Sequence, residues 1–180
     1  GAIADDGGAT LVVTGLADVA DAGGAGITLD NAGANTYGTL TFNSTGAVAI
    51  VENDGTNLAG TNTAASLNLD TNGAIADDGG ATLVVTGLAD FADAAAAGIA
   101  LDNAASNTYG TLTFNSTGAV VINENDGTSL AGVNTAGSLD LDSAAAITDG
   151  STSLAVTALA DFAGTAITVG GGGITSDFGT

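Results

Sequence analysis

The chain repeats itself. Residues 73–144 repeat residues 1–72 with substitutions at 14 positions, so 58 of the 72 positions are identical, and a third copy begins near Ala145 and is incomplete at Thr180. Self-similarity at a fixed period is typical of array architectures, in which every copy builds the same structural unit. We therefore expect one continuous fold, a fragment of a longer array, made of repeat 1 (residues 1–72), repeat 2 (73–144) and a partial repeat 3 (145–180).

The charge of the chain excludes several function classes. It has 20 acidic residues and no Lys, Arg, His or Cys, which gives a formal net charge of −20. Without cations it cannot neutralise the phosphates of nucleic acid, and without His or Cys it lacks the usual bases, thiolate nucleophiles and zinc ligands. No apolar run is long enough to span a membrane. We therefore predict no enzyme activity, no cofactor, no nucleic-acid partner and no direct membrane insertion.

The apolar content argues for a folded chain in spite of this charge. Hydrophobic residues make up 45% of the sequence, more than a disordered acidic segment carries. The acidic side chains are then best interpreted as a solvated coat that keeps a repetitive protein soluble. The lack of Lys and Arg also leaves trypsin-like proteases no cleavage site, which suits an exposed location.

Short stretches of alternating apolar and polar residues predict β-strands. Turn-forming residues separate the stretches, and no segment has a convincing helical period. Leu16 to Ala22, bounded by Gly15 and Gly23, predicts a bent strand or corner. In repeat 1 the expected strands are residues 10–14, 26–30, 39–43, 47–51 and 66–70.

The two complete copies distinguish inward from outward positions. Outward positions vary, as at Thr28/Ala100, Ala49/Val121, Val51/Asn123 and Asn68/Asp140. Inward positions do not vary, and we predict that they form a packed core: Leu11, Val13, Ile27, Leu29, Leu40, Phe42, Val48, Ile50, Leu67 and Leu69, with Leu83, Val85, Ile99, Leu101, Leu112, Phe114, Val120, Ile122, Leu139 and Leu141. Val19, replaced by Phe91 and Phe162, predicts a corner site with slack.

The lengths of the segments predict an all-β parallel solenoid. Each 72-residue repeat divides into three segments of similar build, so we predict about 24 residues per rung and three rungs per repeat. A single rung cannot bury its apolar face alone and must stack on its neighbours. With rungs about 4.8 Å apart, a repeat would advance about 14 Å along the axis.

Four phrases carry a resemblance to a known family. TLTFNSTGAVAIVENDGTNLAGTNTAASLNLD (39–70), GAIADD (73–78), GITLDNAGANTYGTL (26–40) and ITSDFGT (174–180) resemble repeats of filamentous-haemagglutinin-like, adhesin-like bacterial surface proteins. The resemblance implies a right-handed β-helix, an extracellular or cell-surface location, and a structural or adhesive role. It supplies no catalytic residues.

Two acidic clusters are candidates for weak Ca²⁺ binding, because calcium prefers several oxygen ligands. Asp5-Asp6 recurs as Asp77-Asp78, and Glu52-Asn53-Asp54 recurs as Glu124-Asn125-Asp126. Neither an EF-hand loop nor a GGxGxDxUx nonapeptide is present. A polar turn is the favoured interpretation of both clusters, with calcium as the alternative.

Two further motifs have structural and functional interpretations. Asn43-Ser44-Thr45 and Asn115-Ser116-Thr117 match the N-glycosylation sequon, but the end of a strand is the favoured interpretation. Tyr37 and Tyr109, and Phe178 in the third copy, precede glycine. Packing in the core is favoured for these rings over a stacking platform for a glycan.

These observations leave two expectations of function. The first is a structural component of an extracellular fibre, stalk, sheath or adhesive filament, with homotypic self-assembly and a surface glycan or cell-surface molecule as candidate partners. The second is an array of calcium-stiffened β-sandwich repeats that act as a binding module, because NTYGTLTFNSTGAV (35–48) also resembles strands of cadherin-like adhesion repeats.

Overall fold

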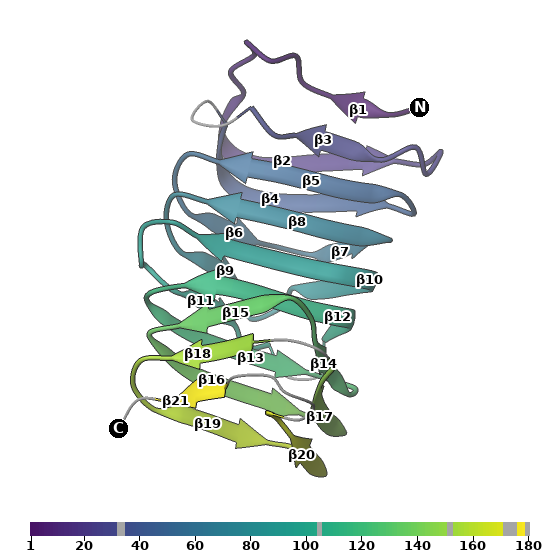
Figure 1. The fold of residues 1–180 in the computed structure, drawn as a ribbon. Coiled ribbons are helices and arrows are strands. Elements are labelled where there is room, and N and C mark those ends of the chain that lie inside the picture. Colours follow the sequence, from purple (N-terminus) through teal and green to yellow (C-terminus); the bar gives the residue numbers. More distant parts are fainter. Residues whose placement is uncertain (32–34, 104–105, 151–152, 171–175, 179–180) are drawn as a thin grey trace.

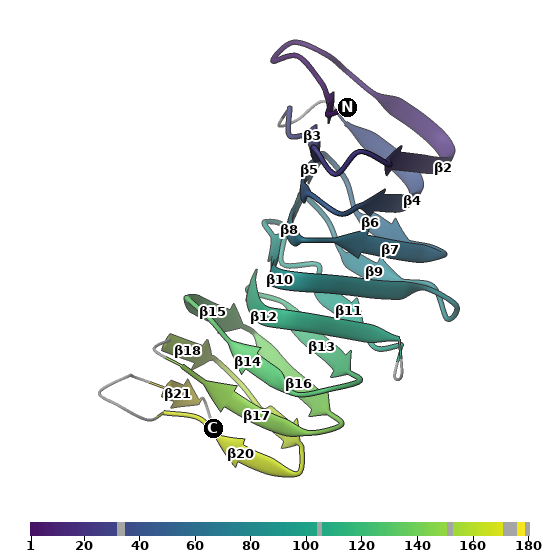
Figure 2. The ribbon, with the colours of Figure 1, turned by 90° about the vertical axis from the view of Figure 1, so that its right-hand side faces the viewer.

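The chain coils into a parallel β-solenoid. The computed structural model describes residues 1–31, 35–103, 106–150, 153–170 and 176–178. Strands of one turn pair in parallel with strands of the next, so the turns stack into a rod (Figures 1 and 2). The described residues contain no helix long and apolar enough to cross a membrane. This all-β solenoid confirms the predicted fold class; its right-handed sense stays a prediction.

Twenty-one strands make up the coil. Their bounds are β1 Ile3–Ala4, β2 Val12–Asp21, β3 Ile27–Leu29, β4 Thr36–Ser44, β5 Ala47–Glu52, β6 Thr56–Leu58, β7 Thr61–Ala64, β8 Ser66–Thr71, β9 Ile75–Asp77, β10 Thr82–Asp93, β11 Ile99–Leu101, β12 Asn107–Ser116, β13 Ala119–Glu124, β14 Thr128–Leu130, β15 Val133–Ala136, β16 Ser138–Ser143, β17 Ala146–Asp149, β18 Ser153–Val156, β19 Ala160–Ala163, β20 Ala166–Thr168 and β21 Ser176–Phe178.

Two long ladders run along the rod. The first ladder contains, in order, β1, β3, β5, β8, the second half of β10, the second half of β12, β14, β17 and β20. The second ladder contains β2, β4, β6, β9, β11, β13, β16 and β19. The remaining strands and the first halves of β10 and β12 form the sides that join the two ladders.

The predicted 24 residues per rung is wrong, because a turn averages about 21 residues. Ile3 pairs with Ile27, Ile27 with Val48 and Val48 with Leu67, so successive turns take 24, 21 and 19 residues. The strands keep their register while the corners between them change in length. The prediction failed because it assumed a whole number of turns in each repeat.

Each repeat instead makes three and a half turns. Ile3 lies in the first ladder, whereas Ile75, the same position of repeat 2, lies in the second. Ile147, the same position of the third copy, lies in the first ladder again, seven pairings after Ile3. Equivalent segments of consecutive repeats therefore occupy opposite ladders of the solenoid, and only every second repeat returns to the same one.

The core contains the residues that the alternating pattern predicted. Of the inward set, every member except Leu11 and Val13 is buried. Leu11 is 38% exposed whereas the equivalent Leu83 is 1% exposed. Leu83 pairs with Asn62 of β7 in the preceding turn, and the described residues hold no such strand beside Leu11. The predicted outward positions are exposed or half-buried in both copies, as expected.

The segment around Val19 is a bent strand, as predicted. The register between β2 and β4 shifts between Val13 and Leu16, and the equivalent shift lies between Val85 and Leu88. Val19 is half-buried in the first turn. Phe91 is fully buried, with its ring edge-on to Tyr109 at a centroid distance of 5.7 Å. Among the described residues, Val19 pairs only with the following turn, whereas Phe91 lies between two turns.

One corner requires glycine in both repeats. Gly26 and Gly98 have φ angles of +106° and +104°, in the left-handed region that side chains disfavour. A Cβ atom on either residue would lie 2.7 Å from the carbonyl oxygen of Ala47 or Ala119 in the next turn. The chain therefore keeps glycine here although neighbouring corner residues change between copies.

Candidate functional site

A buried glutamate recurs once in each repeat. Glu52 is 1% exposed, and its Oε1 accepts a hydrogen bond from the backbone N–H of Tyr37 at 2.7 Å. Its other carboxylate oxygen accepts a hydrogen bond from the hydroxyl of Thr56. Glu124, 4% exposed, makes the same contacts with Tyr109 at 2.9 Å and Thr128 at 2.6 Å. The two glutamates therefore brace a strand of one turn against the corner of the next.

No cation faces these glutamates, because the chain has none apart from its amino terminus. Burial, and to a smaller extent the neighbouring Asp54 carboxyl, raises the pKa of Glu52 to about 7 against the opposing effect of the Thr56 and Tyr37 hydrogen bonds. Burial likewise raises the pKa of Glu124 to about 7, with Asp126 as the acidic neighbour. Each repeat therefore holds a carboxyl pair that gains a proton near neutral pH.

The two tyrosines beside the glutamates are part of the core, which confirms the packing prediction. Tyr37 and Tyr109 are each 3% exposed, and their hydroxyl groups have no hydrogen-bond partner among the described residues. Burial, followed by the charge of Glu52, raises the pKa of Tyr37 to about 12. Burial also raises the pKa of Tyr109 well above its usual value. Neither ring presents a face to a ligand, and the side chain of Phe178 lies outside the described residues.

The predicted calcium residues fall into separate groups. Asp6 and Asp78 accept the N–H of Gly8 and Gly80 within exposed turns. The Asp5 carboxylate accepts the side-chain amide of Asn35 at 3.0 Å, and Asp77 accepts that of Asn107 at 3.4 Å.

The turn interpretation therefore holds for Asp6 and Asp78, while Asp5 and Asp77 link neighbouring turns. Glu52 with Asp54, and Glu124 with Asp126, form the carboxyl pairs. Among the residues that the structure describes, no group of three or more acidic side chains is arranged to hold a metal ion. Calcium binding at these positions stays a prediction.

A second buried acid was missed by the sequence analysis. The Asp93 Oδ2 atom accepts hydrogen bonds from the N–H of Gly98 at 2.6 Å and from the hydroxyl of Ser116 at 2.9 Å, while Oδ1 accepts the N–H of Ala95. Asp21 makes the equivalent contacts in repeat 1. Hydrogen bonds, first of all from Gly26, lower the pKa of Asp21.

This contact explains the sequon-like motif. Ser44 and Ser116 are buried because their hydroxyl groups bind Asp21 and Asp93 of the preceding turn. The aspartate and the serine are 23 residues apart in both copies. The aspartate and the serine recur together in both copies, one turn apart, and this recurrence could have identified the contact from the sequence.

Buried asparagines were also missed. The Oδ1 atom of Asn62 accepts the N–H of Phe42 at 2.9 Å, and its amide donates to the carbonyl of Ala59. Asn134 repeats both contacts with Phe114 and Ala131. These side chains are fully buried and satisfy backbone groups where the strands turn a corner.

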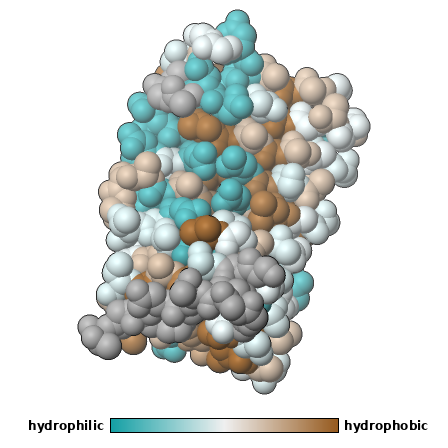
Figure 3. All heavy atoms as spheres, viewed as in Figure 1, coloured by the Kyte–Doolittle hydropathy of each residue, from teal (hydrophilic) through white to brown (hydrophobic). Residues whose placement is uncertain are grey.

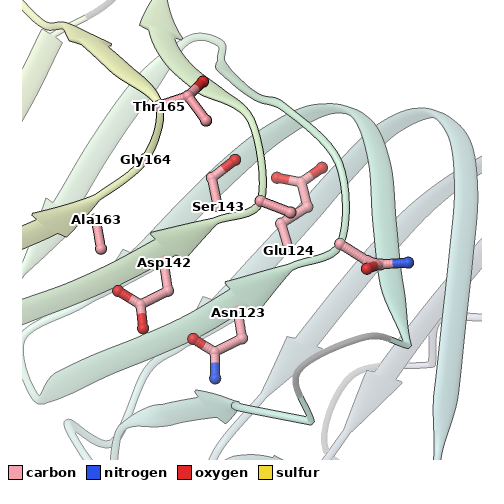
Figure 4. A pocket seen from close by; sticks show the side chains of 9 residues that line it. Asn123, Glu124, Asp142, Ser143, Ala163, Gly164 and Thr165 are labelled. Atoms are coloured by element: carbon pink, nitrogen blue, oxygen red, sulfur yellow. The ribbon is translucent and has the colours of Figure 1, made fainter.

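The buried glutamates border a groove that occurs in both repeats. One groove, of about 510 Å³, is lined by Asn123, Glu124, Asn125, Asp142, Ser143, Ala144, Ala163, Gly164 and Thr165. Asn123, Asp142 and Ala163 lie on successive strands and point to the same side, whereas Glu124 and Ser143 point to the other side (Figure 4).

An equivalent groove of about 420 Å³ is lined by Val51, Glu52, Asn53, Asp70, Thr71, Asn72 and Ala94. Because the repeat makes a half-integral number of turns, one groove follows the first ladder and the other follows the second. Both grooves have amide, hydroxyl and carboxyl groups at their walls.

The outer surface is acidic and has no broad apolar area on the face seen in Figure 3, where hydrophobic residues appear in small groups among hydrophilic ones. Asp140 and Asp161 lie directly beside each other in the second ladder. Burial raises the pKa of Asp140, and the like charges of Asp142 and Asp161 add to this shift. Stacked turns thus bring acidic side chains together along the rod.

The fold and the recurrent site together define a tandem-repeat β-solenoid protein. The model of a family described as "Repeats of unknown function (DUF5649)" matches residues 1–43 and 45–115, more than half of the chain. The chain therefore belongs to this family. Comparison with curated proteins found no match, and comparison with solved structures found none either.

Proposed function

We propose that this chain is a structural segment of an extracellular fibre, stalk, sheath or adhesive filament. The observation that carries the proposal is the pair of uninterrupted parallel ladders, which run from β1 to β20 and from β2 to β19. Every turn is hydrogen-bonded to the turns before and after it. Length is therefore gained by adding repeats, each of which extends the rod by about 17 Å at about 4.8 Å per turn.

The buried polar contacts support a mechanical role. Glu52, Asp21 and Asn62 each join a side chain of one turn to the backbone or side chain of another, and repeat 2 reproduces all three links. Pulling along the axis would have to break such links together with the ladder hydrogen bonds. A rod with these links resists bending at its corners.

The surface chemistry supports an extracellular location. A charge of −20 keeps the outer face hydrated and opposes side-by-side aggregation. The absence of Lys and Arg removes trypsin-type cleavage sites from the 180 residues. Antibody labelling of intact cells compared with permeabilised cells tests the location, and signal only after permeabilisation would contradict it.

The rival arrangement, a β-sandwich of cadherin type, is wrong as a description of the fold, because all strand pairings among the described residues are parallel and join successive turns. A binding function remains the second candidate on the evidence of the recurrent grooves. Their amide, hydroxyl and carboxyl groups suit the hydroxyl groups of a surface glycan. Glycan-array binding that is lost in Asp142→Ala would favour this candidate.

Small-angle X-ray scattering on chains with two, three and four repeats tests the scaffold role. We expect the maximum dimension to increase by about 17 Å per added repeat while the cross-section stays constant. A compact particle would contradict a stiff rod. So would a maximum dimension that grows with repeat number as it does for flexibly jointed units. A wild-type chain treated with a chelator serves as the control for calcium stiffening.

A further inference from the structure

Short groups of strands form the sides of the rod between the two ladders. In the first side group β7, the first half of β10 and the first half of β12 pair in succession and lie one above another (Figure 2). Each leads from the second ladder to the first. In the second side group β15 pairs with β18, and each leads from the first ladder to the second. Because the coil winds in one sense, the two groups lie on opposite sides of the rod.

The side groups avoid acidic residues. None of the 20 acids lies in the first side group (residues 61–65, 82–88 and 106–111) or in the second (133–137 and 153–158). The equivalent stretches of repeat 1, residues 10–16 and 35–39, contain none either. The third copy departs from this pattern at Asp177 in β21. The ladders, in contrast, bring acids together, as at Asp140 and Asp161.

Threonine and apolar side chains cover the sides instead. Thr86 and Leu88 are exposed in the first side group, and Val133 of the second is 59% exposed. Val84 is half-buried at the centre of the first group, where it pairs with Thr63 and Thr108 of the neighbouring turns. Each side therefore presents an uncharged and partly apolar sheet surface on a molecule that is otherwise strongly acidic.

Resting on the scaffold role proposed above, we propose that these acid-free sides are the contacts between copies of this chain, which pack side by side with their rod axes aligned. Two copies that met through their ladders would oppose aspartate to aspartate, and the chain has no Lys or Arg to compensate. Contact through the sides avoids this repulsion. The negative charge thus restricts lateral packing to the sides.

The spacing of the side groups favours a second copy as the occupant. The equivalent strands β7 and β15 begin 72 residues apart, at Thr61 and Val133, which is three and a half turns. The groups therefore alternate between opposite sides about every 17 Å and recur on one side about every 34 Å. A second rod has the same spacing, so several groups can meet at once. A basic partner would instead be attracted to the acidic ladders.

A single side group is too small to hold two copies together. Three strands span about 14 Å along the axis and four residues span about 13 Å along a strand, so one group covers roughly 190 Å². A stable interface buries about 800 Å² on each partner, which corresponds to about four groups. The contact is therefore multivalent, and it strengthens steeply with the number of groups that meet.

Clustering of beads coated with the 180-residue chain tests this contact, because a dense coat supplies many side groups at once. The assay uses about 0.5 M NaCl, which largely screens the general repulsion between acidic coats. Thr14, Thr86 and Thr157 occupy equivalent exposed positions on the sides of the three copies. We expect the triple variant Thr14→Asp, Thr86→Asp and Thr157→Asp to reduce bead clustering at least about tenfold relative to the wild-type chain.

A matched triple variant controls for the three added charges. Thr28, Asn68 and Thr148 are exposed on the first ladder. Asp140 is the natural counterpart of Asn68 in repeat 2, so aspartate is compatible with this position. The variant Thr28→Asp, Asn68→Asp and Thr148→Asp should cluster as the wild-type chain does. Circular dichroism should show that both triple variants are folded.

Wild-type beads that stay dispersed at every salt concentration would overturn the proposal, as would a ladder variant that loses as much clustering as the side variant. Wild-type chains that stay dispersed but bind insoluble cellulose or chitin, and lose this binding in the side variant, would also overturn it and would assign the sides to a polysaccharide. None of these results would alter the rod dimensions measured by scattering, so the scaffold role is tested separately.

Discussion

Glu124 accepts the backbone N–H of Tyr109 at 2.9 Å from a site that is 4% exposed, and Glu52 makes the same contact with Tyr37 at 2.7 Å. A carboxylate in such a place has given up hydration without gaining a cation. Its neighbours compensate by hydrogen bonding, but the charged form remains disfavoured. Several measurable properties of the rod depend on this arrangement and on the other buried polar links.

Stability should rise on acidification. Burial raises the pKa of Glu124 to about 7, above its usual value of 4.5. A raised pKa means that the folded state binds the proton more tightly, so the stabilisation is complete below about pH 4.5 and is lost as the pH rises through about 7. Glu124→Gln should flatten this dependence and raise the free energy of unfolding at pH 8 by about 1–2 kcal/mol. Urea unfolding at pH 5 and pH 8 measures both effects.

Asp30→Asn, at an exposed acid, is the control for removal of one negative charge. An unchanged pH dependence in Glu124→Gln, or the same flattening in Asp30→Asn, would show that general repulsion and not the buried glutamate sets the pH response.

Asp93→Ala should destabilise the corner before β11. The substitution leaves the N–H groups of Gly98 and Ala95 and the hydroxyl of Ser116 without their acceptor. We expect a loss of about 2–4 kcal/mol in the free energy of unfolding, since unsatisfied buried donors are costly. Thermal and urea unfolding measure the loss. Asp102→Ala, at an exposed site, should change stability by less than about 0.5 kcal/mol, and an equally small effect of Asp93→Ala would contradict the structural role.

Asn134→Ala tests the buried amide. The side chain satisfies the N–H of Phe114 and the carbonyl of Ala131, so its removal should cost about 2–3 kcal/mol. Hydrogen exchange should also accelerate at Phe114, which loses its acceptor. The exposed Asn125→Ala serves as the control. Protection at Phe114 that survives the substitution would mean that another group takes over the contact.

The corner at Val19 and Phe91 should respond asymmetrically. Phe91→Val removes a fully buried ring that packs on Tyr109, and we expect a cost of about 2–4 kcal/mol. Val19→Phe enlarges a half-buried residue of the first turn and should change stability by less than about 1 kcal/mol. Urea unfolding measures the free energy of unfolding of both variants. Equal losses would contradict the difference in burial between Val19 and Phe91.

The sequence predicted the strands and the core because alternation is a local property. Leu67 and Leu69, or Val48 and Ile50, show their common face within five residues, and substitution between the copies confirmed the assignment. The length of a turn is not local. It depends on corners such as Gly46, between β4 and β5, and the longer stretch before Gly98, which the pattern of apolar residues does not measure. The error of three residues per turn hid the half-turn offset between repeats.

The candidate site was predicted only in part. The acidic clusters were recognised as recurrent, but sequence alone did not separate Asp6, in an exposed turn, from Glu52, which is buried. Asp93 and Asn134 were missed because one partner of each, Ser116 and Phe114 respectively, lies 20 or more residues away, one turn along the coil. Contacts of this kind become visible only when the register between turns is known.

The half-turn offset is tested most directly by distances between spin labels on three exposed residues, Asn68, Asp140 and Thr148. Asn68 and Thr148 lie on the first ladder, four turns and about 19 Å apart along the axis, whereas Asp140 lies on the second ladder. Labels replacing Asn68 and Asp140 should therefore point from opposite faces and be farther apart than labels replacing Asn68 and Thr148, although fewer residues separate them. A distance of about 14 Å between positions 68 and 140, shorter than that between 68 and 148, would mean three whole turns per repeat and would contradict the structure described for this solenoid.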